Sequence, residues 1–236
     1  MGEVYAEGRR RVCDLVVALP AGEADRPVLT CPEWTVGDVL AHVVGVCADI
    51  LAGDLAGVAT DPWTAAQVRA RKGRSLAELV EEWSDVGPRV EAFADHFPAP
   101  SGPQWVADLT THEHDIRAAV DQPGARESRG VHVGLEFLVT VGLHSAILGR
   151  RLPPLGIRAG ERSWQVGAGE PARGEPGIGG TTDTELNAPP FDLFRALTGR
   201  RSADQVRQLD WRGDPEPYLP AFQFGPFTVS STDIGE

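Results

Sequence analysis

Apolar residues recur every three or four positions through the first 150 residues of the chain, which is the spacing of a buried helix face. Pro20 and Gly22 end the first such segment, whose apolar positions are Val4, Val12, Leu15, Val16 and Leu19. Four further segments with this spacing lie at about 35–50, 75–96, 104–120 and 131–148. Helices that each bury one face pack into a bundle, which we predict for residues 1–150.

The pattern changes after Pro153-Pro154. Residues 156–180 are rich in glycine and include short segments such as 163–166, which favour strands and hairpins. A short helix follows and is expected to end at Gly199. We therefore predict a small α+β domain with a C-terminal tail over residues 151–236, and a fold class that is mainly α.

Three capping boxes mark the N-termini of helices. In each, a Ser or Thr stands three positions before an acidic or amide residue, and each side chain can accept a hydrogen bond from the other residue's backbone N–H group. The pairs are Thr35 with Asp38, Ser75 with Glu78, and Ser202 with Gln205. Helices are therefore predicted to begin directly after residues 35, 75 and 202.

The chain is acidic, with 34 Asp and Glu residues against 22 Lys and Arg residues and a net charge of -12. A nucleic-acid-binding protein usually carries a basic patch, and the longest basic run here is residues 9–11, so we expect no nucleic-acid partner. Three cysteines are too few for a disulfide framework, which favours a reducing compartment. We find no apolar stretch of membrane-spanning length and no signal-peptide layout, so we expect a cytoplasmic protein without a membrane partner.

Two segments carry residue types that bind metals. Asp108 and His112 are four positions apart on one predicted helix and therefore share a face, while His42 lies beside the apolar stripe of another. Bundles often build metal sites from side chains on facing helices. Two imidazoles and a carboxylate leave an open position on a divalent ion such as zinc. On spacing alone, a hydrogen-bonded Asp–His pair that binds no metal is the more common arrangement.

Three longer segments stand out, at residues 31–45 (CPEWTVGDVLAHVVG), 108–119 (DLTTHEHDIRAA) and 191–205 (FDLFRALTGRRSADQ). They resemble two helix signatures and the C-terminal block of the mycothiol-dependent maleylpyruvate isomerase family. The resemblance runs from about residue 5 to 228 and implies a DinB-like four-helix bundle followed by a small α+β domain. The marked bias toward Arg, with Lys72 as the single lysine, fits the high-GC actinobacteria in which mycothiol is made.

This resemblance implies that His42, Asp108 and His112 are the ligands of a divalent metal, with zinc expected first and nickel or another ion as alternatives. The founding isomerase has Glu where this chain has Asp108, so the reach toward the metal differs. Asp115 is expected to hydrogen-bond to His112 or to lie at the helix edge. His114, about 200° from His112 around the helix, is expected to face away from the site, at the surface or behind the ligands.

The implied chemistry uses mycothiol. A thiol bound to a metal is deprotonated, and the thiolate adds to a cis-alkene conjugated to a carbonyl; the bond rotates and elimination releases the trans product. In relatives the thiol is transferred to an electrophile. Arg195, Arg200 and Arg201 are candidate catalytic residues that would bind a substrate carboxylate bidentately. Alternatively, Arg200 and Arg201 only complement the dipole of the neighbouring helix C-terminus.

Cys31 and Cys47 flank the His42 segment. We expect Cys47 to pack as a small apolar residue, and Cys31 to be a packing residue first and a ligand second. Our hypothesis is a cytoplasmic isomerase or S-transferase, monomeric or homodimeric, that takes a small-molecule thiol and a small electrophilic substrate. The alternatives are a metal-dependent hydrolase on the same bundle and a non-catalytic paralogue that binds a metal or ligand to regulate a partner.

Overall fold

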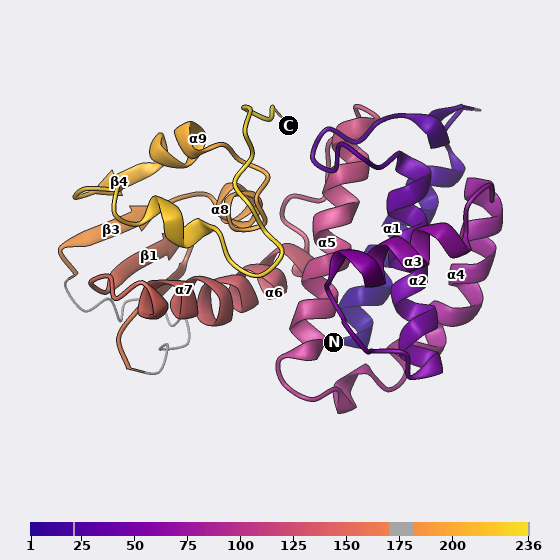
Figure 1. Ribbon diagram of the computed structural model, residues 1–236, viewed down its shortest axis with the longest axis horizontal. Coiled ribbons are helices and arrows are strands. Elements are labelled where there is room, and N and C mark those ends of the chain that lie inside the picture. Colours follow the sequence, from indigo (N-terminus) through magenta and orange to yellow (C-terminus); the bar gives the residue numbers. More distant parts are fainter. Residues whose placement is uncertain (21, 170–181, 236) are drawn as a thin grey trace. The chain divides into compact units, whose positions relative to one another are not determined.

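The computed structural model describes residues 1–20, 22–169 and 182–235 (Figure 1). Their contacts divide the chain into two compact units, Met1–Ala125 and Arg126–Gly235. We expected the first domain to extend to residue 150, but residues 126–149 belong to the second unit. The reason is that this helical stretch packs against a strand and a helix of that unit.

The first unit is a four-helix bundle with one additional helix. Both α4 and α5 pack against both α1 and α2, so that these four helices enclose a common core. A shorter helix, α3, packs against α2. The bounds are α1 (Gly2–Val17), α2 (Val36–Ala52), α3 (Asp61–Ala70), α4 (Leu76–Glu91) and α5 (Ser101–Ala119), with short 3₁₀ turns at Glu23–Asp25 and Ala94–His96.

The predicted capping boxes form at the start of α2 and α4. The side chains of Thr35 and Ser75 accept from the backbone N–H groups of Asp38 and Glu78, and these carboxylates accept in return from the cap residues. The third predicted box, at Ser202, opens α9 in the same way. These local signals therefore fix where three helices begin.

The second unit consists of a small mixed sheet and the helices packed on it (Figure 1). Its strands are β1 (Leu155–Ala159), β2 (Arg162–Val166), β3 (Thr184–Asn187) and β4 (Asp210–Arg212), in the order β2-β1-β3-β4. β1 is parallel to β3, and the two outer pairs are antiparallel. Its helical segments are α6 (Arg129–Phe137), the π-helical segment η3 (Leu138–Leu143), α7 (His144–Gly149), α8 (Pro190–Leu197), α9 (Ala203–Arg207) and η4 (Leu219–Phe222).

The strands predicted within residues 156–180 are present in part. β1 and β2 form a hairpin whose turn includes Gly160 at φ +60°, a conformation that favours glycine. Residues 170–181 of the predicted region lie outside the described residues. α8 is followed by Gly199 at φ +77°, which confirms the predicted end of this helix.

Among the described residues, one helical stretch, Arg129–Gly149, is long and apolar enough to cross a membrane by length and composition alone. Our expectation that no stretch reaches this length is therefore wrong for this segment. Half of the most apolar part of this stretch is buried inside the structure. Its residues Val131, Leu135, Leu138 and Leu143 belong to the core of the second unit. The segment is thus the core helix of a fold that is a helical bundle followed by a small α+β unit, as predicted.

Candidate metal centre

The three predicted ligands converge in the first unit. His42 comes from α2, and Asp108 and His112 come from one face of α5, which packs against α2. Asp108 Oδ1 lies 3.5 Å from His42 Nε2 and 3.7 Å from His112 Nε2. One ligand atom from each residue lies within 4.8 Å of the other two. Both histidines are buried, whereas the Asp108 side chain is 34% exposed, so solvent reaches the cluster at the carboxylate.

Each histidine uses its second ring nitrogen for a hydrogen bond. His42 Nδ1 lies 2.7 Å from Gln67 Oε1, and His112 Nδ1 lies 3.1 Å from Asp115 Oδ2. An amide oxygen and a carboxylate only accept, so each Nδ1 carries a proton, and in the neutral imidazole each Nε2 then presents its lone pair. Ligand histidines are commonly oriented in this way, because the outer hydrogen bond fixes the tautomer. The contact between Asp115 and His112 confirms one of our two expectations for Asp115.

The arrangement fits a divalent cation. Two lone pairs and a carboxylate face one another. Three such acceptors cannot hydrogen-bond among themselves, whereas a cation can bind all three. The distances of 3.5 and 3.7 Å are long for a hydrogen bond, and they approach the separation of about 3.4 Å between ligand atoms around tetrahedral zinc. The alternative of a simple Asp108–His112 hydrogen bond is disfavoured, because 3.7 Å between Asp108 Oδ1 and His112 Nε2 is too long for one and the ring proton lies on Nδ1, toward Asp115.

Trp34 forms an aromatic wall beside the two imidazoles. Its ring centroid lies 5.2 Å from that of His42 and 6.1 Å from that of His112. This tryptophan stands in the segment 31–45 that carried the family resemblance, but its residue type alone assigned it no role. The sequence analysis also missed Gln67, since nothing in local spacing links it to a histidine 25 positions earlier.

The cysteines occupy different environments. Cys31 Sγ lies 3.8 Å from Asp115 Oδ2, and Cys31, His112 and Asp115 form a second group with the residue types of a metal site. Cys47 packs in the core as expected, with its sulfur 3.2 Å from Tyr5 Oη. Burial raises the pKa of the Cys47 thiol to about 11, so this thiol is protonated at neutral pH.

The polar residues around His112 are buried as well. His114 is only 3% exposed, so of the two positions we expected for it, at the surface or behind the ligands, the surface position is wrong. Glu113 is fully buried and accepts two hydrogen bonds from Arg11, at 2.8 and 2.7 Å, and another from Arg117 at 3.1 Å. These ion pairs explain why a polar helix side can lie inside the bundle, since a buried charge must be paired.

The three candidate arginines lie in the second unit. Arg195 is fully buried on α8, while Arg200 donates to the backbone carbonyl of Thr198. Arg201 donates to the carbonyl of Arg200 and pairs with Asp192 at 3.4 Å. Contacts with this unit's own backbone and carboxylates therefore account for part of their hydrogen bonding, and a role toward substrate stays a prediction.

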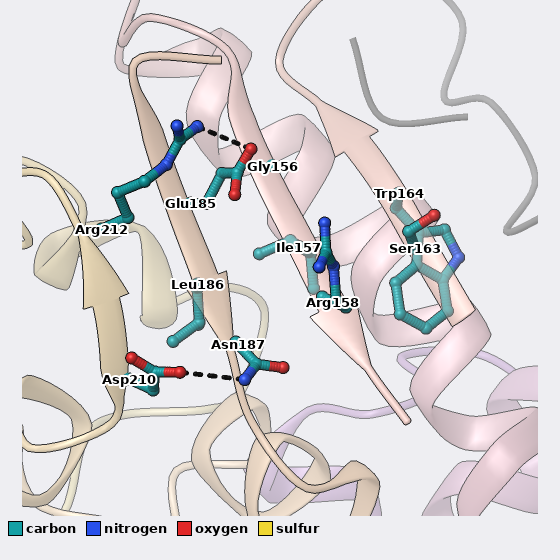
Figure 2. Close-up of a pocket in the computed structure, with 10 residues that line it drawn as sticks. All are labelled: Gly156, Ile157, Arg158, Ser163, Trp164, Glu185, Leu186, Asn187, Asp210 and Arg212. Atoms are coloured by element: carbon teal, nitrogen blue, oxygen red, sulfur yellow. Dashed lines mark hydrogen bonds and ion pairs between the residues drawn. The ribbon is translucent and has the colours of Figure 1, made fainter. Parts of the chain in front are cut away.

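The second unit also has a shallow hollow on the open face of its sheet (Figure 2). Arg212 pairs with Glu185 at 2.6 Å, and Asn187 donates to Asp210 at 2.9 Å. The residues that line it are Gly156, Ile157, Arg158, Ser163, Trp164, Glu185, Leu186, Asn187, Asp210 and Arg212. None of these is a predicted site residue, and their polar groups are typical of a sheet face turned to water.

The first unit is also the part of the chain that similarity to known proteins identifies. The family model for the mycothiol maleylpyruvate isomerase N-terminal domain matches residues 5–126. This match covers more than half of the chain and includes all three candidate ligands. No curated protein and no solved structure matches the chain. The chain therefore belongs to the mycothiol maleylpyruvate isomerase family through its N-terminal domain.

Proposed function

We propose that this protein is a divalent-metal-dependent enzyme that uses mycothiol as cofactor or co-substrate, in an isomerase or S-transferase reaction on a small electrophilic substrate. The observation that carries the proposal is the shared orientation of His42 and His112, whose Nε2 atoms both face Asp108. The family match adds the thiol and the reaction type, since mycothiol and maleylpyruvate isomerase stand in the name of the matching domain.

In this proposal His42, Asp108 and His112 hold the metal, with zinc as the first expectation and nickel as an alternative. When bound, such an ion lowers the pKa of a thiol ligand, so that the sulfur is held as a nucleophilic thiolate. Gln67 and Asp115 keep the two imidazoles in the required tautomer. The partial exposure of Asp108 lets a small molecule reach the cluster from solvent.

The protein's own thiols support the use of an external one. Burial raises the pKa of Cys13 as well as that of Cys47, so neither sulfur is a thiolate at neutral pH. Cys31 is half-buried, with its sulfur 3.8 Å from Asp115 Oδ2. Because two of the three internal thiols are held protonated, a separate thiol is the better source of a nucleophilic sulfur.

A metal-dependent hydrolase is the second candidate. The donor set of two histidines and one carboxylate is also the set found in zinc hydrolases, in which the ion activates water. Arg195, Arg200 and Arg201 stay candidates for binding a substrate carboxylate in either case. The two functions differ in whether the loaded protein responds to a thiol.

Metal content tests the site first. We expect the full chain to bind one equivalent of zinc, and His42→Ala and His112→Ala to lose it. His96→Ala, which changes an exposed histidine, is the matched control and retains the metal. Equal zinc retention by the wild-type protein and both site variants would contradict the proposed ligand set.

Thiol binding tests the function. Mycothiol added to the zinc-loaded protein should release a proton, and Asp108→Ala should weaken both zinc binding and this response. The response is measured with a pH indicator in weak buffer. Absence of proton release, together with zinc-dependent hydrolysis of a simple ester, would replace the thiol enzyme with the hydrolase.

A further inference from the structure

The helix α3 buries an unusual side chain. Within Asp61–Ala70 the buried residue is Gln67, which is 2% exposed, whereas a helix packed on a bundle normally buries an apolar stripe. A buried amide destabilises the fold unless its hydrogen-bonding groups are satisfied. The apolar residues Trp63 and Val68 of α3 are only partly buried, so apolar burial alone does not explain why α3 packs against α2.

Both ends of the Gln67 amide bond to α2. Its oxygen accepts from His42 Nδ1 at 2.7 Å, and its nitrogen donates to Asp49 Oδ2 at 2.7 Å. His42 and Asp49 are seven positions apart and therefore lie on the same side of α2. Because the Asp49 carboxylate only accepts, it fixes which end of the amide faces the imidazole.

The backbone of α2 is shaped to receive this side chain. Gly45 lies between His42 and Asp49, and a Cβ atom at this position would come within 2.5 Å of Gln67 Cβ. A larger residue at position 45 would therefore push α3 away. At its C-terminal end α3 is held by Arg71, which donates to both oxygens of Glu82 on α4, at 3.1 and 2.5 Å.

We propose that α3 is a positioning helix, in which Gln67, held by Asp49, sets the tautomer and direction of His42. Gln67 touches no metal; it keeps the proton on Nδ1 and the lone pair of Nε2 directed at Asp108. This inference rests on the proposed metal site. Removing such an outer hydrogen bond typically lowers metal affinity about 10- to 100-fold, which is the effect we expect here.

Zinc affinity of the full chain, measured by competition with a chromogenic chelator, tests this role. Gln67→Leu keeps the approximate volume but removes the acceptor, so zinc affinity should fall about 10- to 100-fold. In the double variant Gln67→Glu with Asp49→Asn, the carboxylate at position 67 accepts from His42, and the amide at position 49 donates to that carboxylate. Both hydrogen bonds are thus restored, so the double variant should recover most of the zinc affinity. Arg69→Leu, at an exposed position of α3, is the matched control and should bind zinc like the wild type.

Two further readouts keep the test decisive. Nitrogen-15 NMR of the metal-free wild-type protein should show His42 protonated at Nδ1, and the opposite tautomer would overturn the proposal without any variant. Gly45→Ala changes neither His42 nor Gln67, but its Cβ atom would push Gln67 and α3 away from α2, so this variant too should weaken zinc binding. Unchanged zinc affinity in Gln67→Leu also overturns the proposal. Normal zinc binding by His42→Ala would instead contradict the proposed metal site on which this inference rests.

Discussion

Two long helical stretches of this protein are buried for opposite reasons. On α5 the six consecutive residues 110–115 are all polar and all buried. In the stretch 129–149 the buried positions are almost all apolar, with Val131, Leu135 and Leu138 at most 1% exposed. The first helix carries the candidate site, and the second forms a core. In this molecule a run of buried polar residues therefore indicates the candidate site more clearly than a run of buried apolar residues does.

The polar run on α5 is possible because most of its side chains have hydrogen-bond partners inside the first unit. Thr110 and Thr111 donate to backbone carbonyls one turn earlier, both at 2.8 Å. Glu113 is held by two arginines, and His112 by Asp115. The contrast with residues 129–149 predicts that α5 is destabilised when one of its buried polar groups is removed. The helical stretch 129–149 is instead destabilised when a buried side chain loses volume.

The largest effect is expected from Leu138→Ala in the second unit. Leu138 is fully buried, so its truncation leaves a cavity and should destabilise this unit by about 4 kcal/mol. Hydrogen exchange resolved by peptide measures the change, while zinc affinity should stay unaltered. The control Val141→Ala, at a residue that is 39% exposed, should cost well under half as much. Equal effects of the two variants would show that this helix is not a core element.

A smaller effect is expected from Glu113→Gln on α5. The substitution keeps the volume but removes the charge that pairs with Arg11 and Arg117, and should destabilise the first unit by about 2 kcal/mol. Urea unfolding measures it, with Glu81→Gln at an exposed position of α4 as the control. If both variants are equally stable, the buried ion pairs do not hold the polar run in place.

The smallest effect concerns pH. Burial raises the pKa of Cys47 in the folded protein from 9.0 to about 11, so the folded state holds this proton more tightly than the unfolded state. The stabilisation is complete below pH 9 and is lost as the pH rises toward 11, with about 1 kcal/mol lost by pH 10. Thermal unfolding at pH 8 and pH 10 measures it. In Cys47→Ala the decline should be shallower, and an equal decline would assign it to other groups.

Local sequence signals predicted the starts of α2, α4 and α9 and the end of α8, because a cap forms between residues three or four positions apart. They did not place the division between the units. The helix of residues 129–149 has the same apolar spacing as a bundle helix, and only its packing against β2 and α8 assigns it to the second unit. Spacing shows that a face is buried, but not against what.

The same distinction holds at the candidate site. The sequence by itself brought Asp108 and His112 together, since four positions make one helical turn, and it named His42 through a family motif. Only the tertiary structure decided that the Nε2 atoms face Asp108, that Trp34 lies beside them, and that Gln67 orients His42. Direction and tautomer depend on contacts between residues far apart in the chain, and such contacts form only when α3 and α5 pack on α2.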